Sequence, residues 1–445
     1  MAKNRPYRWL KGFGFVFLAL AAGAAFAAWE TARRYHADYD VAIADARRVG
    51  VPLDLEAVIP EPIPDDQNAA LIYNQAAALL DGPLKADQHF LTEISARKNL
   101  STKEQGAEDT TIERLEPALK LVEDCTRPRC QFERDWSAAP NVRFPEIITM
   151  KTLAKDLCLQ ADMRDRRGES KGALESLQAA LKVARGSGSD PVLISLLVSE
   201  AMRAIVSAEL KNLISRDCRN DQTLDRLGRL LVAHMDLPDP RFFFGGEPVF
   251  GLMAARDMNV FQEQDSLADD SPDTSGSQDR PPTVSEKIRN GFPGVREEVE
   301  SKVIETWVVA WSRFPSAAGD WHTTDEALRA ATDFVSRDHS VFNLGASESI
   351  ADLSAIGNLV LRRLATDRIL LCSIAVLEAR NRTGHFPAAL PASLGEESVD
   401  PFGGKPLAYA PSDPGFSIAS VWRSHPEDPV SATDTRKSFV FTLPK

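Results

Sequence analysis

An apolar run near the N-terminus constrains this chain more than any other feature of its sequence. Residues 12–28 are seventeen consecutive uncharged residues, and as an α-helix they would be about 26 Å long, close to the apolar thickness of a bilayer. The basic residues before the run are Lys3, Arg5, Arg8 and Lys11. Because basic residues stay in the cytoplasm, the sequence predicts a cytoplasmic leader and transmembrane anchor over residues 1–29. The chain would cross a bacterial inner membrane once, with its bulk in the periplasm.

The same run also fits a cleaved signal peptide, since the small residues Ala25 and Ala27 flank Phe26 just before Ala28. The run is longer than the roughly 7 to 15 apolar residues of an ordinary signal sequence, which favours the anchor. Both interpretations export everything after Glu30. They differ only in whether the exported part stays tethered to the membrane.

The composition indicates a folded protein with an acidic surface. Hydrophobic residues make up 43% of the chain, and 64 Asp and Glu residues outnumber 52 Lys and Arg residues, giving a formal net charge of −12. A surface that binds nucleic acid needs clustered Lys and Arg to release counterions from phosphates. No such stripe is present in the sequence, so we expect no nucleic-acid partner.

Changes in periodicity divide the rest of the chain into segments of a mainly α fold. Residues 30–64 are predicted to form a stalk helix that stops at Gly50, followed by a Pro-rich connector. Residues 65–260 have the pattern of an α-helical hairpin domain. Residues 261–290 are acidic and poor in apolar groups, which predicts a disordered loop. The last two segments are a helical segment, 291–345, and a C-terminal module, 346–445.

The clearest helical hairpin covers residues 153–185, with its turn at Gly168. Gly168, Ala173, Leu177 and Ala180 resemble the second half of a tetratricopeptide repeat, in which small residues let two helices approach closely. The resemblance implies a TPR-like domain. Only this one unit aligns, so an ordinary helical hairpin remains the alternative.

Two apolar patterns predict buried helix faces. A helix over residues 69–80 follows possible N-cap residues at 65–68. A helix over residues 295–313 has an apolar stripe that we expect to pack inward. Its members are Val303, Ile304, Val308, Trp307 and Trp311.

Five cysteines are present, and their odd number leaves at least one without an intrachain partner. Cys125 and Cys130 are the only close pair, and in an oxidising compartment a disulfide could close their loop. We therefore predict a disulfide between them. A structural zinc site needs four ligands, and no second Cys or His pair lies at ligand spacing. We expect no metal and no other cofactor.

The C-terminal module is predicted to be a long helix followed by a small antiparallel sheet. The helix covers residues 349–382, and its central apolar run, 369–377, is too short to cross a bilayer and reads as a buried core. Gly403 and Gly404 suit a tight turn before the first strand. The predicted strands are residues 407–409, 416–421 and 438–443.

This module resembles the C-terminal part of type II secretion major pseudopilins. The matching motifs are Gly-x-Phe-Pro at 384–387, Asp-Pro-Phe-Gly-Gly-x-Pro-Leu-x-Tyr at 400–409 and Gly-Phe-x-Ile-x-Ser at 415–420. The resemblance implies the fold of the module. Residues 421–426 lack the acidic calcium loop of that family, so neither a calcium site nor fibre assembly is implied.

Over most of its length the chain resembles a family of uncharacterised membrane-anchored helical proteins from planctomycete-like bacteria. The shared features are the motif at residues 66–73 after a Pro-rich connector, the hairpin at Gly168, and the motif at 400–407. This resemblance implies architecture and location without an activity.

No catalytic motif is recognisable, and two hypotheses of different class remain. The first is an extracytoplasmic scaffold or protein-interaction protein, held by its anchor and bound to another envelope protein. The alternative is an envelope hydrolase or carbohydrate-binding enzyme whose carboxylates meet only in the fold. We predict no catalytic residues and favour the scaffold over the enzyme.

Overall fold

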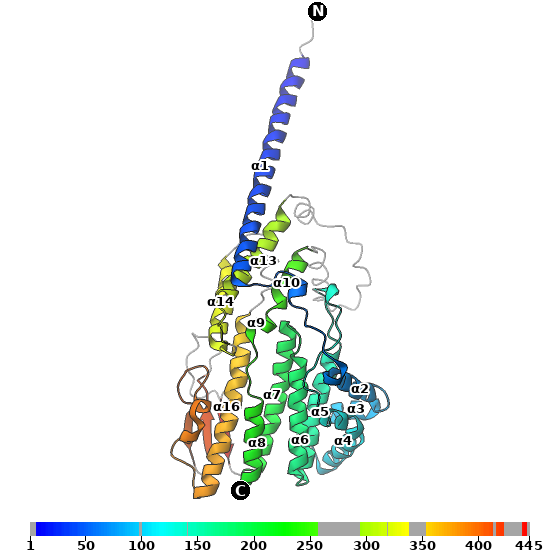
Figure 1. Ribbon diagram of the computed structural model, residues 1–445, viewed down its shortest axis with the longest axis vertical. Helices are drawn as coiled ribbons and strands as arrows, with labels where there is room; N and C mark the ends of the chain where they lie inside the picture. The colour runs from blue at the N-terminus through cyan, green and yellow to red at the C-terminus, as the bar shows by residue number, and fades with distance from the viewer. Residues whose placement is uncertain are drawn as a thin grey trace, which may run out of the picture.

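The computed structural model describes residues 6–97, 100–139, 141–256, 294–317, 319–337, 353–412, 415–421 and 438–442. Across these residues the fold is mainly α-helical, with a small antiparallel sheet near the C-terminus, which confirms the predicted fold class. One long helix projects from an elongated helical body (Figure 1). The predicted disordered loop, 261–290, lies outside the described residues.

Helix α1 (Pro6–Val49) runs for 44 residues without a break. It ends at Gly50, where φ is 83° and a residue with a side chain would be strained. The amides of Gly50 and Val51 both donate to the carbonyl of Ala46, at 2.9 Å. This end confirms the predicted stop of the stalk helix. The helix is long and apolar enough to cross a membrane, and the body buries none of its apolar window.

The second half of α1 is not a free stalk, because it packs along helix α13 (Val295–Trp311). A series of covered residues along α1 alternates in spacing between three and four, as expected for one face of a helix against a partner helix. This series is Ala28, Ala32, Tyr35, Tyr39, Ala42, Ala46 and Val49, and the adjacent residues Glu30, Thr31, Ile43 and Asp45 are also partly covered. The two helices run parallel, since Gly294 lies beside Ala32 and Glu300 lies within hydrogen-bond reach of Tyr39.

Helices α2 to α8 form the larger part of the body. Their bounds are α2 (Ala70–Asp81), α3 (Lys85–Ser95), α4 (Thr102–Glu123), α5 (Glu146–Arg166), α6 (Ser170–Ser187), α7 (Leu193–Arg216) and α8 (Asp221–Ala233). Short 3-10 helices are η1 (Leu55–Ala57), η2 (Asp65–Gln67), η3 (Trp136–Ala138) and η5 (Ala392–Ser398). Helices α5 and α6 are the predicted hairpin, with Gly168 at φ 78° in its turn. Ala173, Leu177 and Ala180 are completely buried, as that pattern predicts.

The described residues form two hydrophobic cores. The larger core combines α2 to α8 with the second half of α16 (Ser354–Thr383) and the sheet. The smaller core joins the end of α1 to α9 (Pro240–Phe243), α10 (Gly246–Arg256), α13, α14 (Trp321–Arg337) and the start of α16. Helices α7 and α16 contribute to both. The predicted hairpin domain and the C-terminal module therefore share a core.

Aromatic side chains fill the smaller core. Phe244 is completely buried, and its ring centroid lies 5.6 Å from that of Phe314, 6.1 Å from Trp307 and 6.4 Å from Trp321. The predicted inward stripe of α13 is confirmed. Its residues Val303, Ile304, Trp307 and Trp311 are buried, and Val308 is half-buried.

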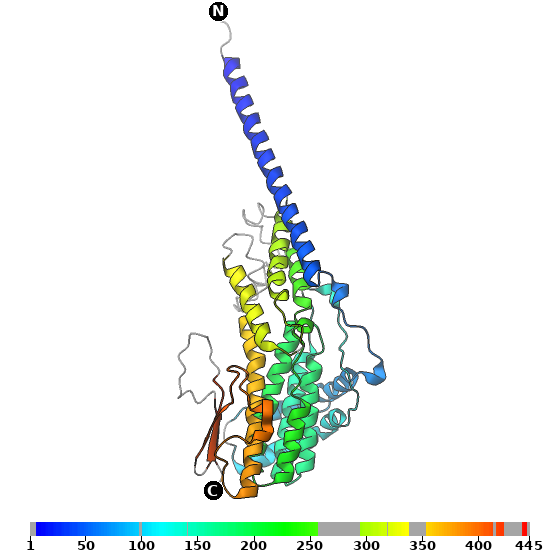
Figure 2. The same cartoon turned by 60° about the vertical axis from the view of Figure 1, so that its left-hand side comes forward.

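The C-terminal sheet contains three antiparallel strands in the order β1-β2-β3. The strands are β1 (Ala408–Pro411), β2 (Gly415–Ala419) and β3 (Ser438–Thr442), close to the predicted ones. Phe416 and Ile418 of β2 are completely buried, and the sheet lies against α16 on the outside of the body (Figure 2). The apolar centre of α16 is buried, which confirms the predicted core helix.

A buried carboxylate explains the acidic residue that begins the motif at 400–409. Asp400 is 1% exposed and accepts hydrogen bonds from the amide of Phe402 at 3.0 Å, the hydroxyl of Ser420 at 2.9 Å and the amide of Val421 at 2.6 Å. The side chain thus ties its own turn to the end of β2. Of the two glycines predicted for this turn, Gly404 has a positive φ of 62°.

Candidate functional site

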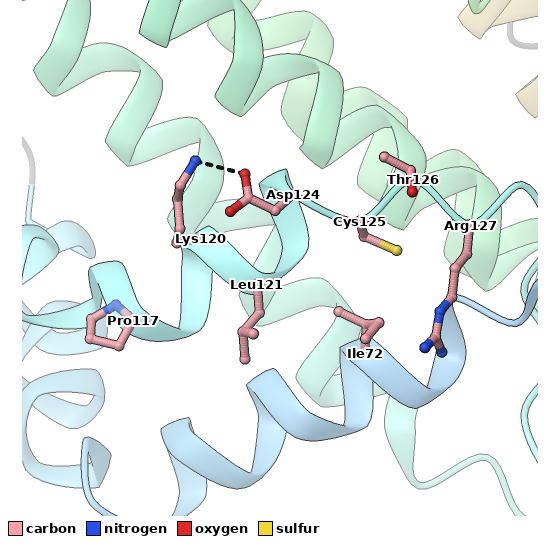
Figure 3. A pocket seen from close by; sticks show the side chains of 8 residues that line it. All are labelled: Ile72, Pro117, Lys120, Leu121, Asp124, Cys125, Thr126 and Arg127. Atoms are coloured by element: carbon pink, nitrogen blue, oxygen red, sulfur yellow. Dashed lines mark hydrogen bonds and ion pairs between the residues drawn. The ribbon is translucent and has the colours of Figure 1, made fainter. Parts of the chain in front are cut away.

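The candidate site is a surface cavity of about 360 Å³ between α2, the end of α4 and the segment that follows α4 (Figure 3). Its walls come from parts of the chain far apart in sequence. The lining residues are Ile72, Pro117, Lys120, Leu121, Asp124, Cys125, Thr126 and Arg127. The cavity includes one residue of the predicted disulfide, Cys125.

The apolar wall of the cavity comes from two facing helices. Ile72 on α2 and Leu121 on α4 are both half-buried, so each leaves part of its side chain open to a ligand (Figure 3). Lys120 and Asp124 form an ion pair of 2.7 Å on the rim, with 55% and 63% of their side chains exposed. An exposed pair of this kind adds little stability. Both groups therefore stay available to a polar partner.

The loop beside the cavity is held in place by Asn68, just before α2. The side-chain oxygen of Asn68 accepts from the amides of Ala70 at 3.1 Å and Gln131 at 2.9 Å, and its side-chain nitrogen donates to the Gln131 carbonyl at 2.8 Å. Arg127 donates to the Asn68 carbonyl at 2.9 Å. The sequence predicts only a helix-capping role for Asn68. In the structure its side chain also fixes the loop at Gln131, which is 63 residues further along the chain.

Cys125 and Cys130 are both free thiols in the structure, so the predicted disulfide is not formed there. Cys125 is buried at the cavity, and Cys130 is half-buried against α6, where its sulfur would lie 3.1 Å from a Cβ atom placed on Gly186. Burial raises the pKa of the Cys130 thiol, with Asp190 adding to the shift. A thiol that resists ionisation is a poor nucleophile. The disulfide stays a prediction.

Two pairs of carboxylates elsewhere in the body are each joined by one arginine whose side chain is buried. Arg134 binds Glu146 and, at 2.6 Å, Asp190. Arg363 binds Glu200 at 3.1 Å and Asp367 at 3.0 Å. A hydrolytic pair must face a cleft that admits substrate and water. These four carboxylates instead balance buried guanidinium groups, so we assign them to the fold.

A second surface cavity, of about 750 Å³, lies between α13 and α14. It contains Glu305 and Asp333 among three basic residues, and Lys302 pairs with Glu305 at 3.1 Å. Among the described residues, no group of three or more His, Cys, Asp and Glu side chains could hold a metal ion.

The two described cavities therefore offer apolar and charged groups to a ligand. The first cavity has apolar walls, an ion pair on its rim and a buried thiol. Of its lining residues, only Cys125 was a candidate site residue from the sequence. The fold and this site define a mainly helical protein with one helix long enough to cross a membrane and a surface cavity fit for a small apolar group. No family model, curated protein or solved structure matches the chain.

Proposed function

We propose that this chain is a membrane-anchored extracytoplasmic scaffold or protein-interaction protein of a bacterial envelope. In this proposal α1 crosses the inner membrane once, with its basic leader in the cytoplasm and the helical body in the periplasm. The body presents the cavity between α2 and α4 to another envelope protein. The proposal includes two further points. The C-terminal module is related to that of type II secretion pseudopilins, and the α5–α6 hairpin is related to a tetratricopeptide repeat.

The exposed apolar surface of α1 is the observation that carries the anchor. Phe15 and Phe17 are each 75% exposed, and Leu18 and Leu20 are each 69% exposed, on a helix that contacts the body only from about Ala28 onward. Soluble proteins rarely leave a continuous apolar surface of this length in water. A bilayer removes it from water, and each square ångström transferred contributes about 25 cal/mol.

The cavity supports a partner of the peptide class. An apolar wall with an ion pair at its rim matches an apolar side chain flanked by polar groups, as in a protein partner whose anchor residue enters a pocket. The fixed position of the loop, through Asn68, means that little ordering is needed on binding. A preformed pocket of this kind loses less entropy when it binds.

A topology measurement tests the anchor. We expect alkaline phosphatase fused after Lys445 to be active in the periplasm, and the full chain to remain in the membrane after carbonate extraction. Phosphatase activity confined to the cytoplasm would contradict the orientation. Release of the chain from the membrane by carbonate would contradict the anchor itself.

A capture experiment with matched variants tests the cavity. The full chain is cross-linked in cells and purified as wild type, as Leu121→Asn in the cavity, and as Ile148→Asn on an exposed face of α5, where Ile148 is 77% exposed. We expect one envelope protein to be retained by wild type and by Ile148→Asn and lost from Leu121→Asn. Equal capture by both variants would contradict the assignment of the cavity, and thermal melting of each variant checks that it is folded.

A further inference from the structure

Helix α1 changes its surroundings abruptly near Ala28. Before this residue the apolar side chains are exposed, as with Phe26 at 64%. From Ala28 onward one face is covered by α13, while the opposite face stays open. The helix has no Gly or Pro between Gly23 and Gly50, so nothing in the sequence provides a hinge between the two parts.

The body begins immediately where the exposed apolar surface ends. Gly294, the residue before α13, lies so close to α1 that a Cβ atom there would be 2.9 Å from the Cα atom of Ala32. Trp29 precedes Ala32 by three residues, a rise of about 5 Å along a helix. If the apolar part of α1 lies in lipid, the top of α13 is therefore at the membrane surface, without a spacer.

A small polar cluster on α1 marks the same level. Trp29 is 60% exposed, and the guanidinium carbon of Arg33 lies 5.9 Å from its ring centroid. Arg33 and Arg34 have 64% and 74% of their side chains exposed, and both contact Glu30, at 3.1 Å and 3.5 Å. Two guanidinium groups against one carboxylate leave one positive charge in excess.

The ion pairs of Glu300 and Glu298 on α13 are made with residues other than Arg33 and Arg34. Glu300 is 6% exposed and pairs with Arg296 at 3.0 Å and with Arg256 at 3.3 Å, while Glu298 lies 3.9 Å from Lys302. These contacts are made within the body. Arg33 and Arg34 thus keep N–H donors directed to solvent, and a planar guanidinium suits a phosphate group well.

We propose that Trp29, Arg33 and Arg34 form a contact site for phospholipid phosphate groups that seats the folded body directly on the bilayer surface. This inference rests on the proposed anchor and adds its lipid ligand. The indole ring lies at the headgroup level, where Trp is favoured, and the two arginines bind phosphodiester oxygens. A juxtamembrane Arg contributes about 1 kcal/mol of attraction to an anionic surface, which corresponds to about a fivefold change in binding.

The test uses the full chain in vesicles of phosphatidylcholine, with and without phosphatidylglycerol, together with a phosphatidylglycerol that carries a photoreactive headgroup. Adducts are located by mass spectrometry after digestion with a protease that cleaves only after lysine, so that the leader up to Lys11 is separate from the peptide that contains residues 29–36. The variant is Arg33→Gln/Arg34→Gln. The control is Arg47→Gln/Arg48→Gln, an equally charged pair on the same helix, about 21 Å further into the body.

We expect adducts in residues 29–36 of the wild type, unchanged in the control and reduced about 25-fold in the variant, since two arginines at about 1 kcal/mol each are removed. Adducts that are absent there, or equal in variant and control, would overturn the contact site while leaving the anchor intact. Loss of the wild-type chain from carbonate-washed vesicles would instead overturn the anchor. Adducts on the basic leader do not interfere, because they map to a different peptide.

Discussion

Arg363 provides the sharpest test of how the body is held together. It lies on α16 with 4% of its side chain exposed and donates to Glu200 on α7 at 3.1 Å and to Asp367 on its own helix at 3.0 Å. The perturbation is Arg363→Met, which keeps much of the volume and removes the charge. It leaves two buried carboxylates facing each other across the contact between α7 and α16.

The expected loss follows from the buried charges that remain. Burial already raises the pKa values of Glu200 and Asp367, and the arginine opposes that shift. Removing one partner of a buried ion pair typically costs about 3–5 kcal/mol. Arg203 also lies near both carboxylates but donates to the His234 carbonyl at 2.6 Å. We therefore expect the lower end of the range, about 3 kcal/mol.

The assay is chemical denaturation of the full chain in detergent, followed by circular dichroism. The control is Arg382→Met, at an exposed position near the end of the same helix, where we expect a change within about 0.5 kcal/mol. In a background of Glu200→Gln and Asp367→Asn, Arg363→Met should cost much less than in the wild type, because no buried anions remain to be balanced. Equal losses for Arg363→Met and Arg382→Met would refute this account of the network.

Three further predictions concern single positions. Burial raises the pKa of Asp156 to about 7, so this carboxyl group keeps its proton to a higher pH in the native state than in the unfolded chain. The free energy of unfolding is therefore highest below about pH 4 and falls as the pH rises to about 7. Denaturation at both pH values should show a smaller loss for Asp156→Asn than for wild type, and an equal loss would contradict the assignment. Gly294→Ala should lower the melting temperature, because Gly294 has a φ of 84° and lies against Ala32. Gly106→Ala is the matched control, because Gly106 lies in α4 with open space around it, and it should raise the free energy of unfolding by about 0.5–1 kcal/mol. Asp400→Ala should cost about 1–3 kcal/mol by leaving donors unpaired, which hydrogen exchange at the Val421 amide would detect as lost protection.

Local features of the sequence predicted the elements of this fold well. The end of α1 at Gly50, the hairpin turn at Gly168 and the apolar centre of α16 each depend on a residue type with a direct local consequence. The strands were predictable for the same reason, since turn residues and apolar residues mark their limits. The charged, low-apolar loop predicted at 261–290 lies outside the described residues.

Contacts between distant segments could not be predicted from these patterns. Glu200 and Arg363 are 163 residues apart, and neither stands in a recognisable motif. Asn68 was expected to cap a helix because that is the local role of Asn, yet most of its hydrogen bonds reach a loop that only the fold brings near. The cavity was missed for the same reason, since its apolar wall joins two helices whose own periodicity predicts a plain core.

A layer of buried charged side chains, formed by Glu200, Arg203, Arg363 and Asp367, also explains why the body has two cores instead of one. On α7, Leu196 belongs to the smaller core and Met202 to the larger, and on α16 the change falls between Leu361 and Ile369. The buried side chains of Glu200, Arg203, Arg363 and Asp367 occupy the interval on both helices. Because α7 and α16 run through this layer without a break, and α1 packs into the smaller core, the position of α1 is transmitted to the larger core. A scaffold mounted in this way would hold its cavity at a fixed distance from the membrane, and a helix break introduced in both α7 and α16 at the charged layer is the change that would free it.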